Sequence, residues 1–173
     1  ATTAGNGARG IFAWSNAGDV AIDSGTIVTG GNQATGIMVD ANGNIPFGAY
    51  RPASGGTGLL SIVSDEITTS GNNSWGIGVD HAGPISIVSG SIATSGITAF
   101  GITVYGSDVI SIDSGSVHSA GAGIIAWGDT GPVTIESDDV VVGPNGDIGI
   151  FARTSTGDIV INAGRTETQL VGL

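Results

Sequence analysis

The sequence has no cysteine, few basic residues and no long apolar run. The lack of cysteine excludes disulfide bonds and thiol chemistry, but it does not locate the protein. No stretch of about 18 consecutive apolar residues occurs, so no helix is predicted to span a bilayer. Proline is also scarce, with 5 residues in 173.

Positive charge is the second shortage. The 4 Lys and Arg residues face 15 Asp and Glu residues, which gives a formal net charge of -11. A phosphate backbone would be repelled by this balance, and so would an anionic membrane surface. We therefore predict no nucleic-acid partner and no membrane insertion of this chain.

Glycine and aliphatic residues are abundant in the sequence. The chain has 32 glycines, and 40% of its residues are hydrophobic while only 11% are charged. The hydrophobic fraction argues against disorder, and the absence of a Gly-x-y period excludes collagen. Most of the apolar residues are Ile, Val and Ala, a composition typical of buried strands.

Residues 76–119 show the organisation of the chain, because they contain nearly the same pattern twice. The two copies are GIGVDHAGPISIVSGSIATSG and GITVYGSDVISIDSGSVHSAG. Each holds three short segments in which apolar residues alternate with small or polar ones, which predicts strands with one buried face. Glycines between the segments indicate tight turns. Three short strands that recur at a fixed interval predict one coil of a solenoid.

The end of the third segment measures the repeat along the whole chain. It recurs at intervals of 26, 40, 25, 25, 23 and 26 residues, at Thr3, Thr29, Thr69, Thr94, Ser119, Val142 and Thr168. We therefore predict an all-β, parallel solenoid of about six coils over residues 1–173. Both ends are in phase with the repeat, so we expect a segment of a longer rod, with any export signal outside it. The interval of 40 predicts an inserted loop at about 43–58, and such loops often carry recognition.

Residues that could carry chemistry fall into three groups, each with a structural interpretation. The Asn residues three positions after the end of the third segment are expected to form turns and an amide ladder, at Asn6, Asn32, Asn72 and Asn145. The acidic pairs Asp65-Glu66 and Asp138-Asp139 lie in the second and fifth coils, too far apart to act together, so we expect solvated turns. His81 and His118 stand in no recognisable motif and are expected at the surface. We predict no catalytic residue, no metal ligand and no cofactor, and hence no enzyme.

Outward-facing aromatic residues are the strongest candidates for a contact surface. Period two places Trp14, Tyr105 and Trp127 on one outer face of the first segments, and the inserted loop adds Phe47, Tyr50 and Arg51. Exposed aromatic and arginine side chains are typical of recognition surfaces. The alternative is that loops or neighbouring rods cover these rings, or that the rings protect strand edges.

The coil pattern Gly-Ile-x-Val, Val-x-Ile and Ser-Gly-x-Ile-x-Thr resembles the right-handed parallel β-helix of bacterial surface proteins. Over residues 3–168 it is similar to passenger domains of Gram-negative autotransporters and related filamentous adhesins. The resemblance implies a secreted, extracellular stalk that mediates cell adhesion or aggregation. Its partner would be a glycan or protein on a host-cell or sister-cell surface.

Two other functions remain open. The chain could be a self-assembling extracellular fibre or matrix protein whose rods pack end to end by homotypic association, which electron microscopy would reveal. It could also be a polysaccharide-active β-helix enzyme. Asp138-Asp139 is the one pair in the sequence that is similar to the acidic motifs of such enzymes. Assays of sugar hydrolysis or elimination would separate that class.

Overall fold

A computed structural model describes residues 1–41 and 55–169, which form strands and no helix. Accordingly, no helix in these ranges is long and apolar enough to cross a membrane. The strands are β1 (Thr2–Ala4), β2 (Arg9–Ala13), β3 (Val20–Gly30), β4 (Thr35–Asp40), β5 (Leu60–Ser70), β6 (Trp75–His81), β7 (Ile85–Ser95), β8 (Phe100–Gly106), β9 (Ile110–Ser119), β10 (Ile124–Trp127), β11 (Val133–Val142), β12 (Ile150–Arg153) and β13 (Ile159–Thr168).

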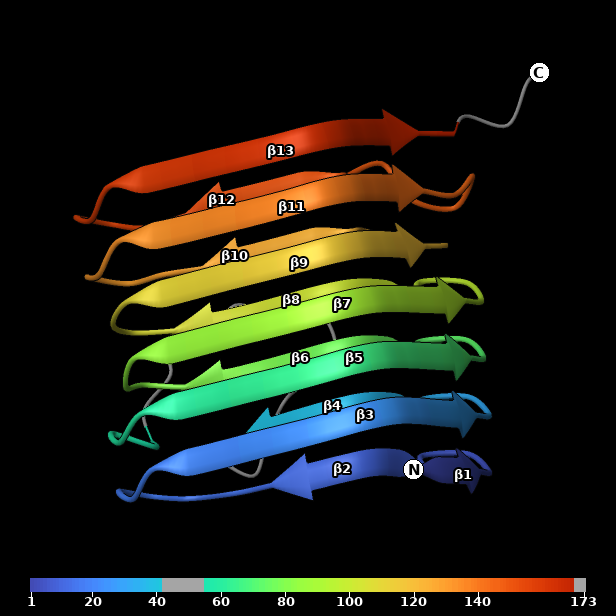
Figure 1. Ribbon diagram of the computed structural model, residues 1–173, viewed down its shortest axis with the longest axis horizontal. Helices are drawn as coiled ribbons and strands as arrows, with labels where there is room; N and C mark the ends of the chain where they lie inside the picture. Colours follow the sequence, from blue (N-terminus) through green and yellow to red (C-terminus); the bar gives the residue numbers. More distant parts are fainter. Residues whose placement is uncertain (42–54, 170–173) are drawn as a thin grey trace.

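The strands form two parallel sheets that the chain visits in turn. One sheet has the order β1-β3-β5-β7-β9-β11-β13 and the other the order β12-β10-β8-β6-β4-β2. In Figure 1 the long strands in front run to the right and the short strands behind run to the left, while the chain climbs from the N-terminus; the coil is therefore right-handed. The predicted all-β parallel solenoid of about six turns is confirmed.

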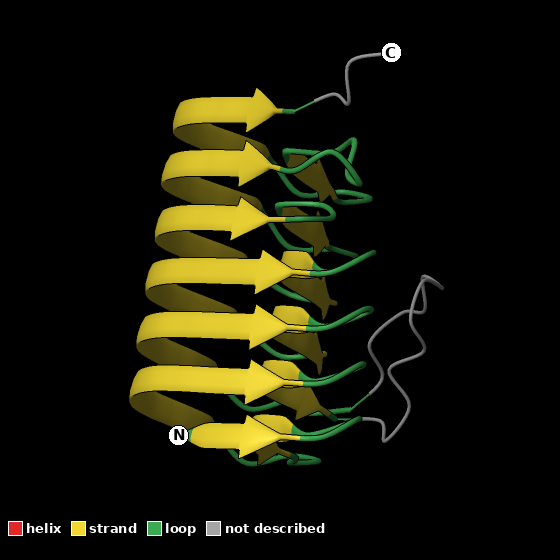
Figure 2. Cartoon of the chain, turned by 90° about the vertical axis from the view of Figure 1, so that its right-hand side faces the viewer, coloured by secondary structure: helices red, strands yellow, loops and turns green. Residues whose placement is uncertain are grey.

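Each long strand contains the second and third predicted segments, joined at a bend. In β7 burial alternates as far as Ser89, then Gly90 and Ser91 both face outward, and Ile92 is buried again. The pairing with β5 skips one position here, between the pairs of Ser89 and Ser91. Two successive outward residues turn the strand around a corner, which Figure 2 shows as the curved side of the coil. The chain thus bends within one strand where the sequence indicated a turn between two.

Stacked aliphatic columns fill the interior of the solenoid. In the long strands Ile87 pairs with Ile62 on one side and Ile112 on the other, and all three side chains are buried. The third-segment positions are also in register, since Thr69 pairs with both Thr29 and Thr94. Burying one isoleucine contributes about 1.5–3 kcal/mol, so the stability of the rod grows with each coil.

The glycine that begins each Gly-Ile-x-Val segment faces the core. A Cβ on Gly76 would lie 2.4 Å from Ile92 Cγ2 and 2.6 Å from the carbonyl oxygen of Gly101. The same contact recurs at Gly101, where a Cβ would lie 2.3 Å from Val117 Cγ1. These glycines let the short strands approach the third-segment aliphatic column closely. They lie within or directly before the short strands, where the Gly-Ile-x-Val pattern predicts them.

The predicted asparagine ladder forms with different chemistry. Asn6 Oδ1 accepts a hydrogen bond from the backbone N–H of Asn32, and Asn32 Oδ1 accepts one from Asn72. In the third hydrogen bond of the ladder, the backbone N–H of Ile97 donates to Asn72 Oδ1. Each side chain therefore caps the backbone of the next turn, whereas we expected amide-to-amide stacking.

Candidate functional site

The outer face of the short-strand sheet contains the three predicted aromatic residues that the structure describes. One outward column contains Asp80, Tyr105, Trp127 and Arg153, which are paired from strand to strand. Trp14 follows β2 and lies in line with Asp40, one residue beyond the pair of Ala13 with Val39. The coils of Asp40 and Asp80 therefore separate Trp14 from Tyr105.

Tyr105 and Trp127 belong to a continuous aromatic stack. Their ring centroids are 6.5 Å apart with an interplanar angle of 22°, and the Phe151 ring lies 4.8 Å from Trp127 at 42°. The guanidinium carbon of Arg153 lies 5.4 Å from the Trp127 centroid. Each such contact contributes about 0.5–1.5 kcal/mol. These contacts join the rings of three successive coils, so the stack stabilises the coils against one another.

Tyr105 lies at the less exposed end of this stack. Burial raises the pKa of its phenol, and the Asp80 carboxylate on the neighbouring strand raises it further. The phenol therefore stays neutral to a higher pH than that of a solvent-exposed tyrosine. Phe151 and Arg153 complete the stack, and the same repeat that located Trp127 places them one coil further on.

Trp14 forms a second, more open aromatic group with Phe12. Trp14 is 58% exposed and Phe12 51%. The indole Nε1–H of Trp14 donates a hydrogen bond of 3.1 Å to the carbonyl oxygen of Ala41, which fixes the ring direction. The guanidinium of Arg9 lies 4.8 Å from the Phe12 centroid. This group offers an exposed ring at a fixed position, as a contact surface requires.

The middle of the same face is buried, contrary to the expectation that its outward column is open. The outward side chains of Met38, Asp40, Asp80 and Thr103 are at most 5% exposed. The ring of Trp75 fills the place of the missing side chain at Gly78, since a Cβ there would lie 2.4 Å from Trp75 Cε3. Among the described residues, the aromatic side chains of this outward column therefore reach solvent only at the two ends of the face.

The expectation of a surface position is wrong for His81. Its side chain is fully buried, and Nε2 lies 2.7 Å from the carbonyl oxygen of Gly58. Gly56 packs directly on the ring, because a Cβ on Gly56 would lie 2.2 Å from His81 Nδ1. The imidazole is thus a packing element between β6 and the residues just before β5.

The remaining predicted contact residues, Phe47, Tyr50 and Arg51, lie outside the described residues, as does most of the predicted loop. Its last residues, 55–58, are described and attached to the solenoid. The N–H of Gly56 donates to the carbonyl oxygen of Asn16, and the carbonyl oxygen of Gly55 accepts from the N–H of Ala82.

His118 is exposed as predicted, but it has ionic partners that the sequence analysis missed. Its Nε2 lies 3.0 Å from Asp139 Oδ2, and Arg165 contacts both Asp139 and Glu167. The hydrogen bond with His118 lowers the pKa of Asp139, and the charge of Arg165 also lowers it. His118 borders a shallow hollow of about 320 Å³ lined mainly by small side chains such as Ala93 and Ala120.

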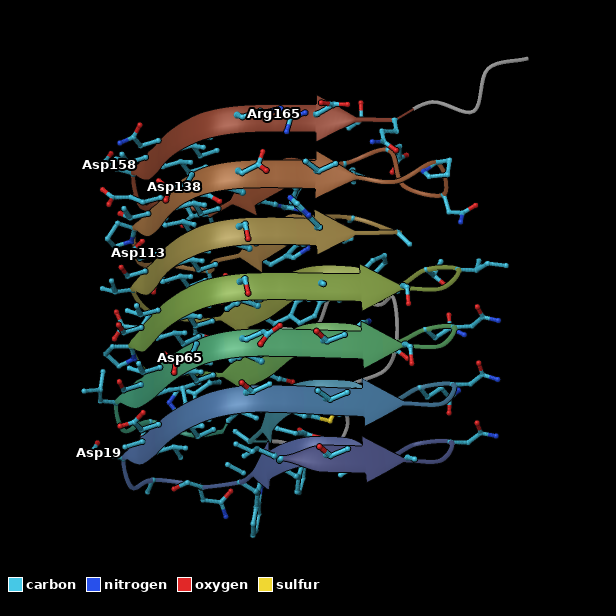
Figure 3. All side chains as sticks on the ribbon, turned by 45° about the vertical axis from the view of Figure 1, so that its right-hand side comes forward. Asp19, Asp65, Asp113, Asp138, Asp158 and Arg165 are labelled. Atoms are coloured by element: carbon cyan, nitrogen blue, oxygen red, sulfur yellow. The ribbon has the colours of Figure 1, made fainter. Side chains whose placement is uncertain are left out.

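Asp138 likewise has neighbours that the sequence analysis did not assign to it. Together with Asp113 and Glu136 it lines a hollow of about 210 Å³, and Figure 3 shows Asp113 and Asp138 on the bent side of the coil. Asp113 and Glu136 are paired on adjacent strands. Over residues 1–41 and 55–169, however, no group of three or more His, Cys, Asp or Glu residues could hold a metal ion.

In the described part of the chain, the ring nitrogens of the two histidines contact the carbonyl oxygen of Gly58 and the carboxylate of Asp139. Comparison with known proteins found no matching family, no matching curated protein and no matching solved structure.

Proposed function

We propose that this chain is a rigid segment of an extracellular structural and adhesive stalk. The observation that carries the proposal is the continuous parallel ladder from β1 to β13, in which the aliphatic core columns stay in register from coil to coil. Such a ladder resists bending and holds surface side chains at fixed spacings, which suits the presentation of contacts at a distance. The extracellular, bacterial setting rests on the resemblance of the coil pattern to β-helical passenger domains.

The proposed contacts are the two open ends of the short-strand face. Trp14 with Phe12 forms one, and the edges of Tyr105 and Trp127 with Arg153 form the other. Aromatic and arginine side chains contribute most where a protein or sugar surface is bound. A cell-surface glycan or protein is therefore the proposed partner.

Replacing Trp14 with alanine tests the adhesive role. Beads coated with the purified chain should attach to epithelial or bacterial cells, and Trp14→Ala should lower this attachment at least about tenfold, as loss of a central contact does. The melting temperature should change little, since the side chain is 58% exposed.

Ile97→Ala provides the matched control, because Ile97 is 60% exposed but lies at a turn on another side of the coil. Equal attachment by the wild type and both variants would remove the assigned contact surface. No attachment by the wild type to any cell or arrayed glycan would contradict the adhesive role itself.

Self-association is the second candidate; for the 173-residue chain by itself it is favoured by the exposure of core-type side chains on β13. Ile159 and Ile161 continue the inward columns of Val133 and Ile135, yet they are 45% and 47% exposed. One edge of β13 pairs with β11, and no described strand pairs with the other. Unpaired edges with apolar side chains are sites of association.

For the 173-residue chain alone, we expect the weight-average mass in sedimentation to rise with concentration. Ile161→Lys should reduce this rise, because it places a charge on the unpaired edge. A strictly monomeric wild type at high concentration would contradict the prediction, as would an unchanged rise in the variant.

A further inference from the structure

The outer face formed by the first halves of β5, β7 and β9 carries three parallel rows of side chains. The outer rows are aliphatic and the middle row is serine, and we call the whole the serine–valine face. Backbone hydrogen bonds and strand pairing place the members of each row on successive coils. The rows are Leu59, Pro84 and Val109; Ser61, Ser86 and Ser111; and Val63 and Val88.

The aliphatic residues of this face are not needed for the core. Leu59 is 48% exposed, Val63 40%, Val88 43% and Val109 39%. Successive coils lie about 4.8 Å apart, and rows two residues apart are separated by about 7 Å. A group of exposed aliphatic side chains at these spacings marks a contact region.

The serine row adds polar groups between the two apolar rows. None of the Ser61, Ser86 and Ser111 hydroxyl groups takes part in a hydrogen bond within the described chain. The hydroxyls can therefore donate to or accept from the backbone of a bound segment, while the flanking aliphatic groups exclude water from it.

The charges around the face decide which kind of partner it fits. In the row of valines, Asp23 pairs with Val63 at one end and Asp113 with Val88 at the other. Asp65 adds a third carboxylate at the bend, and Figure 3 shows Asp65 and Asp113 on this side of the coil. Of the arginines in residues 1–41 and 55–169, Arg9 and Arg153 belong to the short-strand sheet, and Arg165 lies beyond the bend of β13.

A second copy of this chain fits the face poorly. The carboxylates around the face of the second copy would lie against the carboxylates of the first. Directly opposed like charges destabilise an interface. A partner with a cationic rim gains attraction at both ends of the valine row instead. The distance from Asp23 to Asp113 is three coil spacings, about 14 Å, which about four extended residues span.

We propose that the serine–valine face binds an extended polypeptide segment with a short aliphatic centre and Lys or Arg residues on both sides. The aliphatic centre covers Val63 and Val88, and the basic residues reach Asp23 and Asp113. This surface lies on a different face from the aromatic side chains, and the proposal does not require the adhesive role.

The test is the binding of a labelled peptide, acetyl-Lys-Lys-Val-Ser-Val-Lys-Lys-amide, to the 173-residue chain, measured by fluorescence anisotropy at two salt concentrations. We expect binding that weakens with salt and falls at least about tenfold in the double variant Val63→Ser/Val88→Ser. Val28→Ser is the matched control, because Val28 is 38% exposed on the other half of the long-strand sheet; it should bind as the wild type does.

Two further peptides keep the test decisive if the double variant folds poorly. Replacing both valines of the peptide with serine should abolish binding to the wild type, and replacing the lysines with glutamate should do the same. Equal binding of the serine peptide would mean charge attraction alone and would overturn the proposal, as would no binding of the original peptide at millimolar concentration. A dimer that dissociates in the double variant would assign the face to self-association instead.

Discussion

Ile87→Asp is expected to unfold the middle of the rod. The side chain is 1% exposed and lies between Ile62 and Ile112 in the stacked column of the long strands. Loss of the aliphatic group alone costs about 2–5 kcal/mol, and burial of a carboxylate without a partner adds to that. The melting temperature should fall by more than about 10 °C, since about 1 kcal/mol corresponds to 2–4 °C at this chain length.

Ser86→Asp is the matched control for this substitution. Ser86 precedes Ile87 on the same strand but faces outward, between Ser61 and Ser111 on the adjacent strands. The same charge there should leave the melting temperature and the circular dichroism spectrum nearly unchanged. Similar losses in both variants would mean that β7 does not bury Ile87, and hydrogen exchange would show whether the loss is confined to the neighbouring coils.

The coil arrangement could be predicted from the sequence because one physical rule repeats in every coil. Alternation in a strand assigns each residue to a face, and the recurrence of Ile62, Ile87 and Ile112 at equivalent positions fixes which strands are neighbours. The same rule places Tyr105 beside Trp127, so their contact follows from the repeat alone.

The predicted exposure of side chains was wrong where residues from outside the strand pack over its outer face. Asp80 faces outward as its parity requires, and it is nevertheless buried, because burial of an outer face depends on what lies over it. His81 is enclosed by Gly56 and Gly58 in the same way, through contacts that come from a distant part of the chain. Alternation contains no information about such contacts.

The pair of His118 and Asp139 was missed although the sequence contained a signal for it. Val141 pairs with His118, and Asp139 lies two residues before Val141 on the same outer face. Diagonal neighbours of this kind are within reach of long side chains. Use of the repeat to align outward positions, as well as inward ones, would have found the contact.

The core-facing glycines lead to the second large effect, at Gly101. Gly101→Ala places a Cβ 2.3 Å from Val117 Cγ1 and 2.6 Å from the carbonyl oxygen of Gly123. The valine methyl could rotate away, but the carbonyl oxygen belongs to the residue directly before β10, the neighbouring short strand, so backbone there would have to move. Overpacking of this kind costs about 1–3 kcal/mol, and the cost here should lie at the upper end because backbone must shift. The midpoint of urea unfolding measures it.

Gly25→Ala separates this packing effect from the general consequence of replacing glycine. Gly25 lies at the bend of β3, and the nearest atom to a Cβ there is Asp65 Oδ2 at 3.7 Å, an ordinary contact. Alanine should therefore be tolerated or stabilise by up to about 1 kcal/mol, because it reduces the freedom of the unfolded chain. If Gly101→Ala were equally well tolerated, the glycine column would not set the distance between the short strands and the third-segment aliphatic residues. The recurrence of Gly-Ile-x-Val would then need a different physical explanation.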